Sequence, residues 1–146
     1  MVDISWCKKQ AKGIRLINPS DNLSDDYMKR ADLDLDALNN TTGHWKLITA
    51  YYACYDILYS LMMKSGIKSE IHDCTIELMN LFNFSDDDIH FMKRIKNDRI
   101  QVQYYLKDIA LEDENQVKKF IITVKKRISD ITKDEIMDIR KELERR

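Results

Sequence analysis

Residues 44–64 are the segment that most constrains the fold, because apolar side chains lie on almost every side of the helix that they would form. A helix without a broad polar face must be packed by neighbours on several sides. We therefore expect this segment to be the central helix, closed by Gly66 as its C-cap. Its narrow polar stripe consists of Thr49, Asp56 and Ser60, which recur at helical spacing. Asp56 is thus the carboxylate that we expect to be partly buried.

Glycine and proline are scarce, which predicts helices elsewhere in the chain instead of a many-stranded sheet. The 146 residues include three Gly and one Pro, and 44% are hydrophobic and 34% charged, as is typical of amphipathic helices. Start and stop signals predict helices over 5–17, from Ser24 to about 38, over 69–82, from Ser85 to about 110, from Asp113 and from Thr132. The predicted fold is an all-α bundle of about five main helices with short extra ones, in a single domain over 1–146.

Charge and cysteine content limit the setting of the protein. The 24 Lys and Arg nearly balance 25 Asp and Glu, for a formal net charge of -1, so nucleic-acid binding would need a local basic patch. Cys7, Cys54 and Cys74 form no C-x-x-C pair, so neither a zinc site nor a disulfide framework is expected. This predicts a reducing, cytoplasmic location.

The sequence also lacks several kinds of motif. No uninterrupted apolar stretch of about 18 residues could span a bilayer, so no membrane association is expected. The histidines have no metal-ligand spacing, and there is no glycine-rich phosphate loop. Neither a metal nor a cofactor is therefore expected.

An arginine occupies a core position in the helix predicted over 85–110. The apolar stripe of this helix, in steps of three and four, consists of Met92, Ile95, Arg99, Val102, Leu106 and Ile109. Burying an unpaired guanidinium would cost several kcal/mol, so Arg99 is expected to meet a carboxylate or to face an opening or a subunit interface. Asp56 is the expected partner and Asp98 the local alternative. The other interpretation is that the guanidinium reaches past Ile95 into solvent.

Cations, amides and aromatic rings surround Arg99 in the sequence, and this is the chemistry that holds phosphates and stacks bases. Lys96, Gln103 and Tyr104 belong to this segment. Together with Arg99 and Asp56 they are the residues that we expect to bind RNA or a nucleotide.

Three sequence blocks resemble those of small prokaryotic proteins of the HEPN family (higher-eukaryote and prokaryote nucleotide-binding). They are TAYYACY at 49–55, GIKSEIH at 66–72 and DRIQVQYY at 98–105, in this order. The resemblance implies an antiparallel up-and-down bundle that forms a homodimer. It also implies a neighbouring nucleotidyltransferase partner in a toxin–antitoxin or stress-response pair.

Catalytic HEPN members cut RNA without a metal, using an arginine and, after a short spacer, a histidine on the same helix at the dimer interface. Arg99 matches the arginine, but tyrosines follow the spacer and no histidine occurs later in the chain. Tyrosine, with an unperturbed pKa of about 10, is a poor base near neutral pH. His72 would supply the base from another helix, or serve at a helix terminus. Enzyme activity thus stays open, and the alternative is a catalytically silent helical module for dimerisation or protein interaction.

Overall fold

The apolar stretch forms the central helix of the molecule. In this computed structural model, which describes residues 1–146, α3 (His44–Ser65) has an unbroken run of buried residues from Ala53 to Met63. Gly66 ends α3 in the left-handed conformation, with φ at 71°, and its N–H donates to the main-chain oxygens of Met62 and Met63. The predictions of a central helix and of its C-cap are confirmed.

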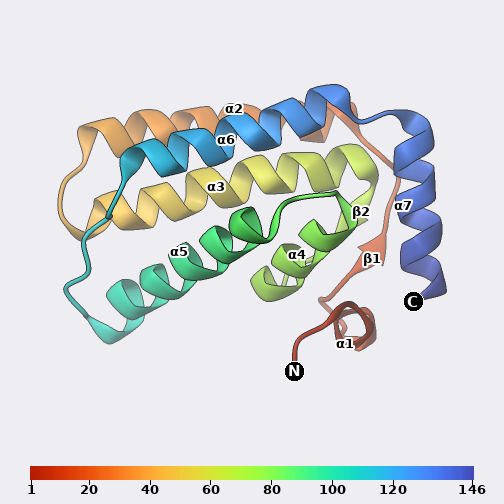
Figure 1. Cartoon of the computed structure of the whole chain (residues 1–146), viewed down its shortest axis with the longest axis horizontal. Coiled ribbons are helices and arrows are strands. Elements are labelled where there is room, and N and C mark those ends of the chain that lie inside the picture. The colour runs from red at the N-terminus through yellow and green to blue at the C-terminus, as the bar shows by residue number, and fades with distance from the viewer.

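Four long helices form the bundle, and a fifth crosses one end of it. α2 (Asp21–Asn40), α3, α5 (Asp86–Tyr105) and α6 (Glu114–Asp130) run alternately in opposite directions (Figure 1). α7 (Lys133–Arg145) lies across the end at which α3 and α6 finish. The all-α prediction is confirmed, since α2, α5 and α6 all pack on α3. None of these helices combines the length and the apolar character needed to cross a membrane.

Short elements complete the fold on one side of α3. α1 (Ile4–Lys9) and β1 (Arg15–Leu16) precede α2, whereas β2 (Ile67–Lys68), α4 (His72–Leu78) and the 3-10 turn η1 (Met79–Leu81) follow α3. β1 and β2 pair antiparallel, with Arg15 opposite Lys68 and Leu16 opposite Ile67.

The helix predicted over 5–17 is shorter than expected. α1 ends at Lys9, and the N–H of Ile14 then donates to the main-chain oxygen of Cys7 at 3.0 Å. Gly13 permits this close return of the chain, because a Cβ at that position would lie 1.8 Å from the same oxygen. Residues 15–16 are then extended by pairing with β2, a non-local contact that overrides helical spacing.

Side-chain caps begin the later helices as predicted. The N-cap side chains of Ser85, Asp113 and Thr132 accept hydrogen bonds from main-chain N–H groups in the first turns of their helices. α2 instead begins after Ser20, which is its N-cap. Ser24, the predicted N-cap, is buried inside α2, and its hydroxyl lies 3.0 Å from that of Ser60 on α3. α5 ends before the predicted residue 110, because Leu106 adopts the left-handed conformation with φ at 54°.

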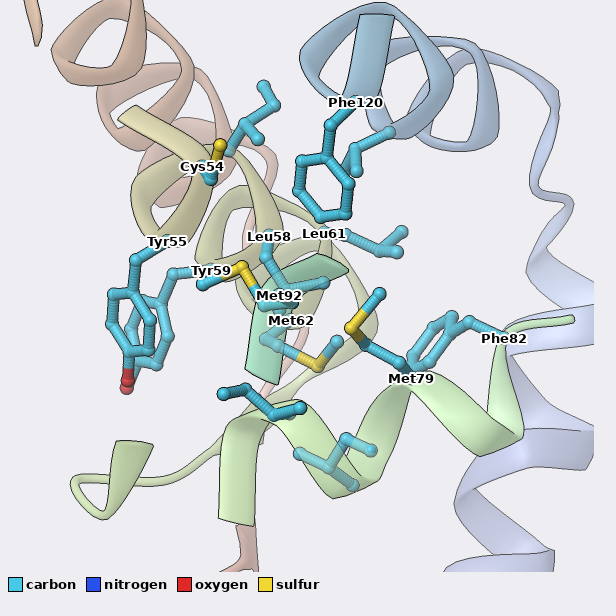
Figure 2. Packing of buried hydrophobic residues seen from close by; sticks show 14 of the residues in the cluster. Cys54, Tyr55, Leu58, Tyr59, Leu61, Met62, Met79, Phe82, Met92 and Phe120 are labelled. Atoms are coloured by element: carbon cyan, nitrogen blue, oxygen red, sulfur yellow. The ribbon is translucent and has the colours of Figure 1, made fainter. Parts of the chain in front are cut away.

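Sulfur-containing and aromatic side chains fill the core beside α3. Figure 2 shows Met62 close to Met79 and Phe82, which lie on the segment after α4, and Phe120 approaching from α6. Thioether side chains adapt to irregular gaps between helices. One cluster of 37 buried residues includes side chains from every helix.

Cys7 and Cys74 form a disulfide that joins α1 to α4, which corrects the expectation that the chain contains no disulfide. Both residues are fully buried. Residues separated by 67 positions meet only because α1 packs on α4, so sequence spacing could not reveal the pair. Cys54 is a buried free thiol.

Candidate functional site

Arg99 lies on the packed side of α5, as its spacing predicts, with 5% of its surface exposed. Its guanidinium carbon lies 4.6 Å from the centre of the Tyr51 ring, 5.6 Å from that of Tyr52 and 5.8 Å from that of Tyr104. Nη1 of Arg99 donates to Oε1 of Gln103 at 3.2 Å, while the buried Nε has no hydrogen-bond partner. Aromatic faces attract a guanidinium most strongly where water is excluded, so the rings stabilise this charge.

The prediction of a carboxylate partner for Arg99 is wrong. Arg99 takes part in none of the ion pairs of the protein. Asp56 lies beside Asp34 of α2 instead. Among the charges around Asp98, that of Arg94 has the largest effect on the pKa of Asp98. The guanidinium does not reach past Ile95 into solvent either, because Arg99 is buried. A search for carboxylate partners could not predict this environment, because a planar guanidinium can also stack on aromatic rings.

His72, from the start of α4, meets the same tyrosine as Arg99. Its Nδ1 lies 2.7 Å from the hydroxyl of Tyr51, and its ring stacks on that of Tyr55 with centres 4.1 Å apart. Burial lowers the pKa of His72 to about 4, with further lowering by the charges of Arg99 and Lys96. The imidazole is therefore neutral at pH 7. The structure thus brings His72 and Arg99 together around Tyr51, although they come from different helices.

A row of tyrosines along α3 was not singled out as a functional feature from the sequence. Tyr51, Tyr55 and Tyr59 recur every four residues, and successive ring centres lie 5.9 Å apart in each of the two pairs. Figure 2 shows the rings of Tyr55 and Tyr59 side by side, with their hydroxyls pointing the same way. Burial raises the pKa of Tyr51 and Tyr55, so both hydroxyls stay protonated. The signal that could have revealed the row is its i, i+4, i+8 spacing.

A groove of about 630 Å³ opens beside this row, between α2, α3 and the segment 68–72. We call it the tyrosine groove; its lining includes Tyr27, Tyr52, Tyr55, Tyr59, Asp34, Asp56 and His72. Asp56 is 8% exposed. Its burial, together with the neighbouring Asp34 carboxyl, raises the pKa of Asp56 well above its usual range, against an opposing effect of Arg30. The prediction that Asp56 is a buried carboxylate is confirmed, but it lies in this groove and not against Arg99.

The remaining predicted binding residues lie at the edge of the Arg99 site. Tyr104 and Gln103 are exposed, and Tyr104 is near enough to Arg99 to cover its guanidinium from outside. Lys96 forms an ion pair with Asp73 at 2.8 Å, which ties α5 to the start of α4 next to His72. Lys96 therefore contributes positive charge near His72 while its own ammonium is partnered.

Comparisons with protein families, with curated proteins and with solved structures found no match. The arrangement of side chains is therefore the basis for a functional assignment. No three His, Cys, Asp or Glu side chains are placed to hold a metal ion together. The groups available for binding or catalysis are an arginine packed by aromatic rings, a neutral histidine and a pair of carboxyl groups.

Proposed function

We propose that this chain is a HEPN-like protein that binds RNA or a nucleotide through the guanidinium of Arg99. The main support is a buried guanidinium that no carboxylate neutralises and whose Nε has no partner. Such a cation keeps its charge for an anionic ligand, and arginine presents paired N–H donors that match a phosphate. Tyr104 is exposed, and the centre of its ring lies 5.8 Å from the guanidinium carbon. A shift of this side chain would give a phosphate access to Arg99.

Aromatic side chains near Arg99 suit single-stranded RNA better than duplex. Bases stack on aromatic rings with about 1–3 kcal/mol each, largely irrespective of sequence. Tyr52 and Tyr104 both have rings within 6 Å of the guanidinium carbon, at 5.6 and 5.8 Å. With a formal net charge of -1, the protein has no overall attraction for polyanions, so we expect weak, salt-dependent binding through few phosphates.

The proposal includes a homodimer, a nucleotidyltransferase partner in a toxin–antitoxin or stress-response pair, and a cytoplasmic location. The homodimer and the nucleotidyltransferase partner follow from the resemblance to HEPN proteins. The cytoplasmic location follows from the cysteine spacing alone, and the disulfide between Cys7 and Cys74 argues against it. In the HEPN family the arginines of two subunits share one polar cleft at the dimer interface. The position of Arg99 near the exposed end of α5 is compatible with such a cleft.

A charge-removing substitution tests the proposal. We expect Arg99→Met, which keeps an unbranched apolar stem, to weaken binding of a fluorescent single-stranded RNA at least tenfold, measured by anisotropy at low salt. Losing one charged hydrogen-bonding group is worth about 1.5–3 kcal/mol, which is consistent with a tenfold change or more. Circular dichroism would establish that the variant is folded.

Arg94→Met is the matched control, because it makes the same change on the same helix at an exposed side chain that donates to Gln116. We expect its effect on RNA affinity to be less than threefold. Equal losses in the two variants would show that any cation on α5 serves, and the Arg99 site would then be rejected.

A second function, RNA cleavage with His72 as the base, is favoured by the contact of His72 with Tyr51 beside Arg99. A neutral imidazole can accept a proton, although a pKa of about 4 makes it a weak base. Gel analysis of the same RNA after long incubation checks this, since cleavage by the wild-type protein should disappear in His72→Ala. RNA that stays intact with wild-type protein removes this function and leaves binding untouched.

A catalytically silent interaction module is the alternative from another class. It predicts that Arg99→Met changes the oligomeric state while the wild-type protein has no affinity for RNA. Binding assays and mass measurements on the same two samples therefore separate the alternatives.

A further inference from the structure

The hydrogen bond between Tyr51 and His72 has only one direction that satisfies both side chains. The hydroxyl of Tyr51 lies 2.7 Å from Nδ1 of His72, and it makes no other hydrogen bond. Tyr51 is fully buried, so water is not available to its hydroxyl. The guanidinium of Arg99 beside the ring has only N–H donors. Because a buried O–H needs an acceptor, Tyr51 donates to Nδ1, which is therefore unprotonated.

This direction fixes the tautomer of His72. The lowered pKa of His72 keeps the imidazole neutral at pH 7, and a neutral imidazole with an unprotonated Nδ1 carries its hydrogen on Nε2. Stacking on Tyr55, with ring centres 4.1 Å apart, holds the plane of the ring. Nε2 has no hydrogen-bond partner in the protein and is not buried. An N–H donor of His72 is thus available to a ligand.

Two cations line the tyrosine groove together with His72. They are Arg30 of α2 and Lys68 of β2, and neither forms an ion pair. Phosphate oxygens accept hydrogen bonds most strongly from charged donors of this kind. One neutral and two charged donors in a groove of about 630 Å³ therefore suit a phosphate group.

The carboxyl groups of the groove leave these cations without a counterion. Glu70 is bound to Arg15 at 2.9 Å. Asp34 and Asp56 lie beside each other, and burial together with the Asp34 carboxyl raises the pKa of Asp56, so the two carboxyl groups share a proton. The single negative charge that remains on this pair is outnumbered by the two cations.

The groove adjoins the Arg99 site through two neighbouring tyrosines. The ring of Tyr52 lines the groove, and its centre lies 5.6 Å from the guanidinium carbon of Arg99. Tyr51, which is bonded to His72, lies 4.6 Å from the same carbon. A nucleic acid held at Arg99 therefore has a continuous path past Tyr52 into the groove.

We propose that His72, held by Tyr51 as the Nε2–H tautomer, donates a hydrogen bond to a second phosphate of the RNA, which lies in the tyrosine groove. The inference rests on the proposed function, since Arg99 holds the first phosphate. It makes the ligand an oligonucleotide and not a mononucleotide, with Tyr51 as a positioning residue. His72 then has no free lone pair to take a proton, so this role and RNA cleavage with His72 as the base exclude each other.

Nitrogen NMR of isotope-labelled histidine side chains tests the tautomer without RNA. At pH 7 we expect an unprotonated Nδ1 and a protonated Nε2 for His72, whose signals are identified by their loss in His72→Gln. Tyr51→Phe keeps the ring and removes the hydroxyl, so His72 should become a mixture of both tautomers, which a change of packing alone would not cause. A protonated Nδ1 in the wild-type protein would overturn the proposal.

Anisotropy with the fluorescent RNA tests the contact of His72 with the ligand. We expect His72→Met to weaken binding about fivefold, as for the loss of one hydrogen bond. His72→Gln should stay within about twofold, because its side-chain amide can donate from the position of Nε2 but cannot act as a base. Equal losses in these two variants, or a mononucleotide that binds as tightly as the RNA, would overturn the proposal.

Salt dependence tests the phosphate in the groove with a second variant, which does not alter the core. Lys68→Met should make the slope of log affinity against log salt shallower by about 0.7, the value for one phosphate of a single strand. Lys29→Met, at an exposed lysine of α2 outside the groove, is the matched control and should leave the slope unchanged. Equal changes in both variants would contradict a phosphate in the groove.

The outcomes separate this inference from the proposed function. Weaker binding by Arg99→Met, with full affinity in His72→Met and Lys68→Met, would overturn the inference and leave the proposed function standing. Wild-type protein without affinity for RNA would overturn both.

Discussion

Arg99 and Arg140 show two ways in which a single residue places a guanidinium inside this protein. Arg99 relies on aromatic faces, whereas Nη1 of Arg140 donates to the main-chain oxygens of Ile17, Ser65 and Gly66, at 2.9, 3.2 and 2.6 Å. The second arrangement joins α7 to the end of α3 and to the residue after β1. It depends on Gly66, because a Cβ there would lie 2.4 Å from Nη1 of Arg140.

Gly66→Ala is therefore expected to destabilise the protein more than a left-handed conformation alone explains. An alanine at positive φ costs about 1–2 kcal/mol, and here it would also displace Arg140 from its three acceptors. We expect a total loss of about 3 kcal/mol in the free energy of unfolding, measured by urea denaturation. Gly66→Ala in an Arg140→Met background is the control, because the backbone conformation is then the same and only the contact with the guanidinium is missing. Equal losses with and without Arg140 would show that this residue is irrelevant to the effect.

At the scale of helices, local signals predicted much more than contacts between elements did. The extent of α3 followed from its apolar run and Gly66, and the starts of α5 and α7 followed from Ser85 and Thr132. α1 was predicted too long because the chain is turned back by a hydrogen bond between Ile14 and Cys7 and then paired with β2.

The same limit applies to the site. The core position of Arg99 was visible as a break in an apolar stripe, but its surroundings were not, because Tyr51 and His72 reach it from two other elements. Carboxylates were the partners considered, and Asp56 was paired with the wrong group for that reason. Which elements are neighbours depends on packing, and spacing within one helix contains no information on it.

The disulfide between α1 and α4 leads to a prediction at this scale. The disulfide closes a loop of 67 residues. By constraining the unfolded chain, such a bond stabilises the folded protein by about 4 kcal/mol at most. We expect the double substitution Cys7→Ser and Cys74→Ser to lower the free energy of unfolding by about 2–4 kcal/mol in urea denaturation.

Thiol counting provides the check on the disulfide itself. Unfolded wild-type protein without reductant should titrate one thiol, that of Cys54, and reduced protein all three cysteines. Three thiols without reductant would contradict the bond. Alkylation of the protein inside intact cells would further test the proposed cytoplasmic location, where disulfides are rare.

The two ends of the helical bundle differ in whether a helix covers them. α7 covers the end at which α3 and α6 finish, whereas no helix crosses the opposite end, where α3 begins and α5 stops (Figure 1). Large apolar side chains remain exposed on these two termini: Trp45, Tyr104, Tyr105 and Leu106. Tyr104, Tyr105 and Leu106 are consecutive, so they form one exposed apolar group at the end of α5. Contiguous apolar surface of this kind marks interaction sites, and aromatic side chains are enriched at such interfaces.

If a second copy covers this end, as the proposed homodimer requires, then a charge placed there should separate the subunits. We expect wild-type protein to have the mass of a dimer in sedimentation equilibrium and Tyr105→Glu to be a monomer at the same concentration, because a carboxylate buried without a partner opposes association. Ile122→Glu, at a residue of α6 with 66% of its surface exposed, is the control for adding a charge to an exposed apolar side chain and should remain a dimer. A monomeric wild type would refute the shared cleft, whereas binding of RNA by Arg99 could still be measured on the single chain. A dimer that persists in Tyr105→Glu would instead place the interface elsewhere, and the apolar end of α5 would then be available to another protein.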